Sequence, residues 1–153
     1  MLLRQFLLTQ GGFDHEIFIP VPPEAVLARL SRPEDWIRLQ PLVIAIDEDP
    51  RTPGMFRVTD RLKVGGLAFH LRYRAQVLPV SDGIDGHAWS FPFIHVVNRL
   101  RCHAQDGGTL LRETSTLEAP RPLLGYAVKT ARAAHAAMLA NLSEALVQRS
   151  GTP

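Results

Sequence analysis

The 153-residue chain has one cysteine, no long uninterrupted hydrophobic run and no block of like charges. Cys102 alone cannot form a disulfide within the chain, so the fold must depend on a hydrophobic core, and we expect a reducing, cytoplasmic location. Arg4 and Gln5 interrupt the apolar residues near the N-terminus, and no small-residue cleavage site follows them. We therefore expect neither a secretory signal nor stable insertion into a membrane.

The charge is nearly balanced, with 17 Lys and Arg against 15 Asp and Glu, and fifteen of the basic residues are Arg. They are scattered from Arg4 to Arg149 and form no Lys/Arg-rich block of the kind that binds nucleic acid. Hydrophobic residues make up 46% and charged residues 21%, as in ordinary globular proteins, and the length suits one domain. We predict a single domain over residues 1–153 with no nucleic-acid partner, and the sequence leaves the oligomeric state open.

The first third of the chain predicts a strand followed by two short helices. Residues 13–19 alternate between apolar and polar side chains, as a strand with one buried face does. A Pro-Pro pair then begins a helix that runs to about Ser31, because proline suits the first helical turn. Pro33 begins a second short helix, and Pro41 ends it.

The rest of the chain predicts a run of strands and one long helix. Between residues 42 and 118 the hydrophobic period becomes two and turns recur, which predicts an antiparallel meander with one buried face. After Arg121-Pro122 a segment rich in Ala and Leu runs to about Arg149, which predicts a long helix. Its apolar stripe is Leu124, Val128, Ala131, His135, Met138, Leu142 and Leu146. The meander is the only surface long enough for this stripe, so we predict an α+β fold in which the sheet curls around the helix.

Alternation assigns an inward face to three strands of the meander. The inward residues are Phe56, Val58, Asp60, Leu62 and Val64, then Leu67, Phe69, Leu71, Tyr73, Ala75 and Val77, and then Ile94, Val96, Asn98, Leu100, Cys102 and Ala104. Most of these side chains are apolar, so the polar ones among them are the candidates for a binding site.

For two strands, alternation does not decide which side chains face inward. Over residues 84–91 the inward set is either the aromatic one that includes Trp89 or the smaller one that includes Ala88, and burial of the larger rings favours the first. Over residues 109–118 the leucines share the parity of Glu113, which favours an inward Glu113.

The chain has no nucleotide-binding loop, no catalytic serine motif and no paired Cys and His with zinc spacing, so we expect no cofactor and no metal. Four polar residues fall on inward faces: Asp60, Tyr73, Asn98 and His135. Each of them either lines a pocket or is a core residue with a hydrogen-bond partner, because an unpaired buried polar group is costly. The imidazole of His135 is also suited to proton transfer near neutral pH.

Two segments resemble a known family. Residues 18–42, FIPVPPEAVLARLSRPEDWIRLQPL, are similar to the opening of bacterial polyketide cyclase/dehydrase-like proteins of the SRPBCC (START-like, birch-pollen-allergen-like) superfamily. Residues 109–146, TLLRETSTLEAPRPLLGYAVKTARAAHAAMLANLSEAL, are similar to its ending. The resemblance implies a helix-grip fold, in which six or seven curved antiparallel strands wrap the C-terminal helix and two short helices close a deep cavity.

The resemblance also limits the possible functions. Members of the superfamily bind apolar molecules such as lipids, sterols and polyketides, and some are cyclases, aromatases or hydrolases. It gives His135 a position in the pocket lining but no assigned role, and it transfers no catalytic set to this chain.

Our leading interpretation is a cytoplasmic protein that binds a small hydrophobic or aromatic ligand, lipid-like or polyketide-like, in an internal cavity. The candidate ligand-binding residues are Asp60, Tyr73, Trp89, Asn98, Glu113, His135 and Met138. The alternative is a cyclase, aromatase or dehydratase in which His135 and Asp60 transfer protons and Tyr73 donates one. A protein-interaction module is a third interpretation, and the sequence identifies neither the ligand nor the pathway.

Overall fold

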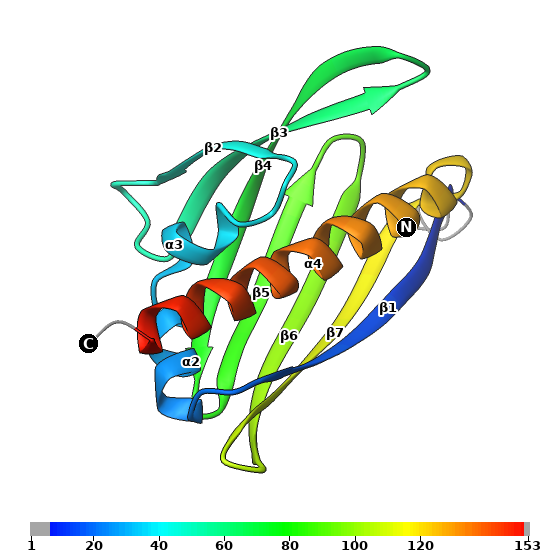
Figure 1. The fold of residues 1–153 in the computed structure, drawn as a ribbon. Helices are drawn as coiled ribbons and strands as arrows, with labels where there is room; N and C mark the ends of the chain where they lie inside the picture. The colour runs from blue at the N-terminus through cyan, green and yellow to red at the C-terminus, as the bar shows by residue number, and fades with distance from the viewer. Residues whose placement is uncertain (1–6, 152–153) are drawn as a thin grey trace.

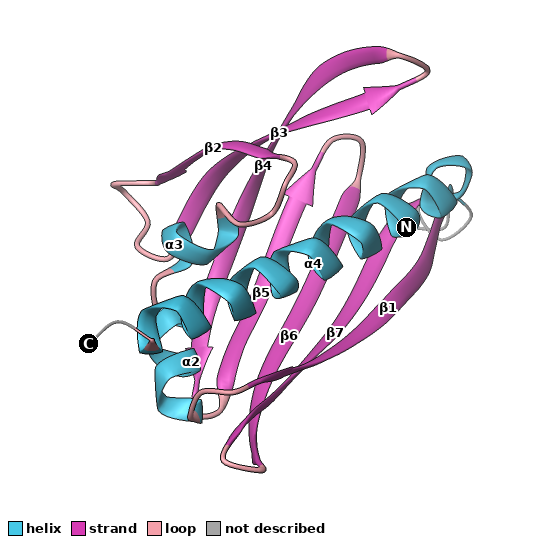
Figure 2. Ribbon diagram, viewed as in Figure 1, coloured by secondary structure: helices cyan, strands magenta, loops and turns pink. Residues whose placement is uncertain are grey.

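A seven-stranded antiparallel sheet carries a long helix across one face, which we call the inner face, in the computed structural model (Figures 1 and 2). The strands are β1 (Leu8–Ile19), β2 (Val43–Glu48), β3 (Met55–Val64), β4 (Leu67–Val80), β5 (Gly83–Ser90), β6 (Ile94–Gln105) and β7 (Gly108–Pro120). The helices are α2 (Pro23–Leu30), α3 (Pro33–Ile37) and α4 (Arg121–Ser150). The predicted order of elements and the α+β helix-grip fold are thereby confirmed.

The structure describes residues 7–151. Residues 1–6, on which the argument against a secretory signal partly depends, and the last two residues of the predicted domain lie outside this range. Among the described helices, none combines the length and the hydrophobicity that crossing a bilayer requires.

The topology brings the first strand beside the last. The sheet order is β1-β7-β6-β5-β4-β3-β2, so the meander pairs consecutive strands and β1 is added next to β7, from Leu8 opposite Pro120 to Ile19 opposite Thr109. Pro120 then ends β7, and Pro122 is accepted in the first turn of α4 because its missing N–H would have no partner there. The chain therefore turns directly from the sheet into α4, which crosses the inner face diagonally (Figure 1).

The second half of α4 makes the core. Met138, Leu139, Leu142 and Leu146 are buried among apolar side chains of the sheet and of α2 and α3, including the fully buried Leu30. In the first half of the helix the predicted stripe is only partly buried: Leu124, Val128, Ala131 and His135. The stripe thus has the predicted register, but only its C-terminal half is fully buried.

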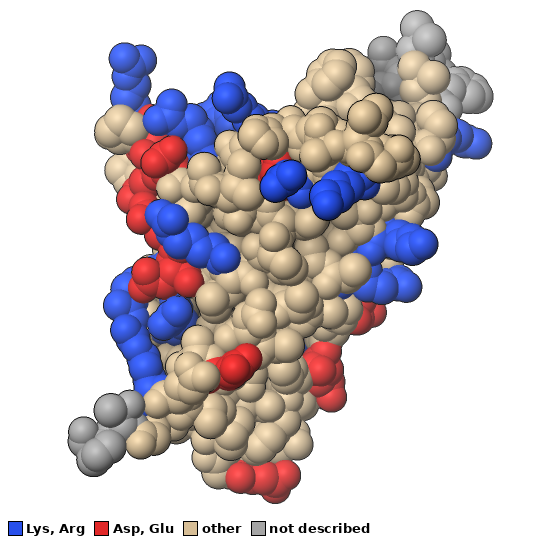
Figure 3. All heavy atoms as spheres, turned by 45° about the horizontal axis from the view of Figure 1, so that its top comes forward, with Lys and Arg blue, Asp and Glu red and all other residues tan. Residues whose placement is uncertain are grey.

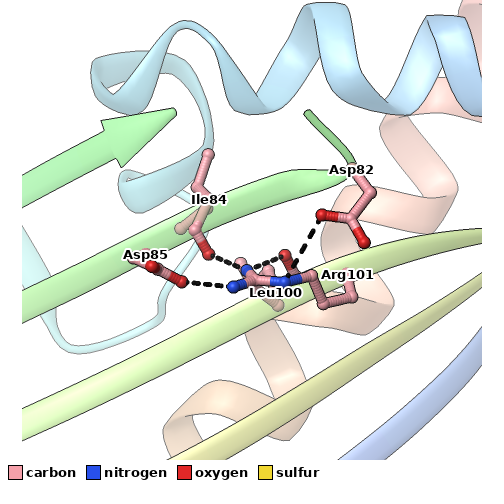
Figure 4. A network of polar contacts seen from close by, with 5 residues as sticks. All are labelled: Asp82, Ile84, Asp85, Leu100 and Arg101. Atoms are coloured by element: carbon pink, nitrogen blue, oxygen red, sulfur yellow. Dashed lines mark hydrogen bonds and ion pairs between the residues drawn. The ribbon is translucent and has the colours of Figure 1, made fainter. Parts of the chain in front are cut away.

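A cluster around Arg101 holds the end of the sheet where α2 lies (Figure 4). The Arg101 guanidinium donates to the carbonyl oxygens of Ile84 (2.8 Å) and Leu100 (3.0 Å) and to Asp85 Oδ1 (2.6 Å), and its Nε lies 3.5 Å from Asp82 Oδ1. Charge-assisted bonds of this kind are shorter and stronger than neutral ones. The cluster therefore ties β5, β6 and the turn before β5 together.

Three inward residues near the β3–β4 turn contradict the prediction that they are buried. Val64, Leu67 and Phe69 are 46%, 76% and 43% exposed, and Ala104, next to the β6–β7 turn at the other end of the sheet, is exposed as well. The alternation is right, but the β3–β4 hairpin extends beyond the other strands and beyond α4, so nothing covers the inner face of its tip (Figure 1).

The prediction that Trp89 faces inward is also wrong. Trp89 is 40% exposed, and the buried set of β5 is the smaller one, with Ile84 and Gly86. On the outer face Trp89 stacks with His87 and His95, with ring centroids 5.6 and 5.3 Å apart. The rings thus gain aromatic contacts outside the core.

Gly83 and Gly125 provide a matched test of the close pairing of β5 with β6. A Cβ on Gly83 would overlap the carbonyl oxygen of Leu100 on the neighbouring strand, whereas a Cβ on Gly125 of α4 meets nothing within 4 Å. Gly83→Ala should lower the free energy of unfolding by about 1–3 kcal/mol, because the β5 and β6 backbones must separate. Gly125→Ala should raise it by about 1 kcal/mol through helix propensity. Denaturant titrations of both variants measure these differences, and equal effects would contradict the strand pairing.

Candidate functional site

A pocket of about 320 Å³ lies between the partly buried half of α4 and the inner faces of β3 to β6. Its walls are mostly apolar and include Val58, Leu71, Ala75, Leu117 and Met138. Its polar lining residues include Gln40, Asp60, Tyr73, Ser90, Asn98 and His135. An apolar pocket of this size with a few convergent polar groups has the character of small-molecule sites.

Asp60 and Tyr73 form one polar pair in the pocket. Asp60 is on β3 and Tyr73 is on the neighbouring β4, where Tyr73 is opposite Val58, two residues before Asp60. The Tyr73 hydroxyl donates to Asp60 Oδ1 at 3.3 Å. Burial raises the pKa of the Asp60 carboxyl from 3.8 to about 6, although the Tyr73 hydrogen bond and the charge of His135 act in the opposite direction. Burial, and then the neighbouring carboxylate, raise the pKa of Tyr73. Tyr73 therefore stays protonated as a donor, while Asp60 can gain or lose a proton near neutral pH.

Glu113 and His135 form a second pair, between β7 and α4. His135 Nδ1 lies 2.9 and 3.0 Å from the two carboxylate oxygens of Glu113, whose side chain is fully buried. A carboxylate at this distance favours a proton on Nδ1, which then donates to Glu113. In the neutral ring this leaves Nε2 as the acceptor, and His135 itself lines the pocket. The pair can therefore present a hydrogen-bond-accepting nitrogen of fixed orientation.

Asn98 is held by a third contact. Ser115 of β7 is directly opposite Asn98 of β6, and its hydroxyl donates to Asn98 Oδ1 at 3.0 Å. The Asn98 amide N–H groups are then the part of this side chain that can donate to a bound molecule.

The structure brings five of the seven candidate residues into the pocket lining: Asp60, Tyr73, Asn98, His135 and Met138. Glu113 faces inward, as the parity of its strand predicts, but it contacts His135 instead of lining the pocket. Trp89 is on the outer face and is outside the lining.

Sequence reasoning missed Gln40 and Ser115. Ser115 shares the inward parity of Glu113, so alternation along β7 could have found it. Gln40 is buried in the turn after α3 and lines the pocket, but no periodic pattern covers that turn. Within residues 7–151 no three His, Cys, Asp or Glu side chains gather closely enough to hold a metal ion.

The model of one protein family matches residues 10–149, and its description is polyketide cyclase/dehydrase and lipid transport. The chain belongs to this family. The match confirms the SRPBCC resemblance that the two terminal segments suggested. No curated protein matches the chain in sequence.

Solved structures share the family fold at low sequence identity. The Zhui aromatase/cyclase from Streptomyces sp. R1128 is 14% identical with a TM-score of 0.67, over 93% of this chain and 96% of its own. The di-domain aromatase/cyclase StfQ of the steffimycin biosynthetic pathway is 16% identical with a TM-score of 0.69, over 99% of this chain and 54% of its own. Ara h 8.0201 is 19% identical with a TM-score of 0.63, over 92% of this chain and 99% of its own. At these identities the likeness establishes the fold.

Replacing Asp60 by Asn should stabilise the fold in a pH-dependent way. Because the folded-state pKa is raised from 3.8 to about 6, the folded state holds a proton that the unfolded state loses over this range, so the wild type loses stability as the pH rises through it. Asp60→Asn should therefore gain about 1–3 kcal/mol over the wild type above pH 6 and nothing below pH 3.8. Denaturant titrations at both ends of the range measure this gain. The exposed Asp14→Asn is the control, and a gain that does not change with pH would contradict the burial argument.

Proposed function

We propose that the chain binds a small hydrophobic or aromatic molecule, lipid-like or polyketide-like, in this pocket. The observation that carries the proposal is the pocket itself, whose apolar walls surround a few polar groups that converge from β3, β4, β6 and α4. Apolar burial supplies affinity in such sites, and a few hydrogen bonds supply orientation.

The polar groups suit a ligand that carries a hydroxyl or carbonyl oxygen. Tyr73 and Asn98 offer hydrogen-bond donors, and His135 Nε2 offers an acceptor opposite the Glu113 contact. Met138 adds an adaptable apolar wall. The buried Cys102, the only cysteine, supports a cytoplasmic location.

A cavity-filling substitution tests the proposal directly. Ala131 lines the pocket and Ala133 lies exposed on the same helix, so Ala131→Phe and Ala133→Phe add the same side chain inside and outside the pocket. Titration with naphthol, a small aromatic alcohol, should show saturable binding by the wild type and by Ala133→Phe. Ala131→Phe should weaken it by about tenfold or more, because the ring occupies the site. Equal affinities in folded variants, or no binding by the wild type, would contradict the proposal.

The Glu113–His135 pair favours a second candidate function, an acid/base reaction of the cyclase, aromatase or dehydratase type. A carboxylate on Nδ1 orients the ring and leaves Nε2 free to accept a proton from a bound molecule. Asp60, with a pKa of about 6, can exchange a second proton, and its pKa responds to the charge of His135. Binding alone does not require two proton-transferring groups in one pocket.

The two functions separate when binding and turnover are measured on the same variants. With a poly-β-ketone substrate analogue, His135→Ala should abolish turnover, and Glu113→Gln should lower kcat by about 10²-fold or more while naphthol binding stays within a few-fold of wild type. His15→Ala is the matched control, because His15 also contacts α4, through the carbonyl oxygen of Arg132, but lies outside the lining. Full turnover by His135→Ala would remove His135 from the mechanism.

A further inference from the structure

The mouth of the pocket lies at one end of the sheet. Three residues of the lining are themselves exposed: Phe69 of β4 by 43%, Phe91 after β5 by 82% and Tyr126 of α4 by 43%. Antiparallel connections alternate between the two ends of a meander, so the β3–β4 turn, the β5–β6 turn and the start of α4 share one end (Figure 1). The pocket therefore opens where these three segments meet.

Large apolar side chains surround this mouth. We call them the apolar rim: Val64, Leu67, Phe69, Phe91, Phe93 and Tyr126. They make up half of the twelve large hydrophobic residues that are exposed among the described residues. Exposed apolar groups concentrated in one place mark an interaction surface, whereas single ones elsewhere need no explanation.

The segments that form the mouth carry positive charge and no negative charge. Residues 61–81 contain Arg61, Lys63, Arg72 and Arg74 but no Asp or Glu. Residues 119–143, which include the first two-thirds of α4, contain three basic residues and again no acidic one. Within residues 7–151 no ion pair is formed by Arg61, Lys63, Arg72 or Arg74.

Most acidic residues lie elsewhere, although Glu118 of β7, opposite His95 of β6, lies at the mouth end and Asp60 lines the pocket. Asp82 and Asp106 are in the turns at the opposite end of the meander, and Glu24 is in α2 at that same end (Figure 1). In Figure 3, which turns the mouth end forward, red side chains lie among blue ones along the left edge and over the lower part, one small red area lies beside blue side chains in the upper middle, and much of the forward surface is uncharged. The molecule thus has a basic, apolar end and a more acidic end.

The order of groups along the β3–β4 hairpin indicates what this end fits. Leu67 and Val64 flank the turn, Lys63 lies two residues from Gly65, and Arg61 lies four residues from it. At about 3.3 Å per residue, the two charges lie about 7 and 13 Å behind the apolar tip. A bilayer has the same two layers: hydrocarbon that the apolar tip can enter, and above it phosphates that the basic residues can contact. Amphipathic segments enter the interface by about 5–10 Å.

We infer that the apolar rim docks onto a lipid bilayer with an anionic surface, so that the mouth of the pocket faces the membrane. The rim side chains enter the interface, and the basic residues behind them contact lipid phosphates. The inference goes beyond the proposed function and does not require it, because the rim and the charges would bind the surface whether the pocket is filled or empty.

Sedimentation with vesicles tests the inference on the full chain. The wild type should sediment with vesicles of phosphatidylcholine mixed with phosphatidylglycerol, and much less with phosphatidylcholine alone. Added salt should weaken the binding, because it screens exposed charges. No sedimentation of the folded wild type with the mixed vesicles at low salt would overturn the inference. Binding of the wild type to an acidic protein, but not to the mixed vesicles, would overturn it as well.

Matched pairs of variants locate the surface. Leu67→Ser/Phe93→Ser removes two rim side chains that are outside the pocket lining, and Leu78→Ser/Val147→Ser removes two exposed apolar side chains away from the mouth. The rim variant should bind mixed vesicles about tenfold or more weakly than the wild type, and the control variant should bind as the wild type does. Equal loss in both variants would overturn the inference.

Two further variants test the charges and the independence from ligand binding. Arg61→Ser/Lys63→Ser should weaken vesicle binding by about thirtyfold, whereas Arg51→Ser/Arg149→Ser, with the same net charge, should have little effect. Equal effects would show attraction by net charge alone and overturn the inference. Ala131→Phe should bind vesicles normally even if it no longer binds naphthol, so the two proposals can fail separately.

Discussion

The structure depends on how α4 meets the sheet. β7 runs directly into α4 through Pro120, and the helix then crosses the inner face diagonally (Figure 1). Its C-terminal half packs among side chains of the sheet and the short helices and contributes the fully buried Leu142. Its N-terminal half packs along one side on β1, where His15 contacts the Arg132 carbonyl oxygen and the Phe13 and His135 rings touch, and the pocket occupies the space between its other side and β3 to β6. One apolar stripe therefore supplies both the core and a wall of the pocket.

The same geometry explains why the buried polar groups occur in pairs. An unpaired carboxylate or imidazole inside the sheet would cost several kilocalories per mole, so each needs a partner. Glu113 has His135, Asp60 has Tyr73, and Asn98 has Ser115. Each pair joins two elements and includes at least one residue of the pocket lining. Stability and the chemistry of the pocket thus depend on the same contacts.

Much of this arrangement could be predicted because a strand has a strict period of two. Alternation placed Asp60, Tyr73 and Asn98 on one surface, and the leucines of β7 oriented Glu113. The failures occurred where alternation does not say which of two sets of side chains faces inward, or whether an inward side chain is covered by another element. For Trp89 side-chain size was used instead, although stacking with His87 and His95 gives the rings contacts outside the core. For Leu67 the period was right, but no local pattern reports that α4 ends short of the hairpin tip.

Charge was the property that the linear sequence conveyed least. Arg61, Lys63, Arg72 and Arg74 alternate with apolar residues and form no basic run, yet alternation on two paired strands puts all four on one surface of one hairpin. In that hairpin the inner residues Leu62 and Phe69 line the pocket, while the outer residues carry the charge. The Arg101 cluster ties the strands together at the other end, where acidic partners are present. The same alternation therefore has different results at the two ends of the sheet. At one end Arg101 forms ion pairs, and at the other the four basic residues of the hairpin form none within the described chain.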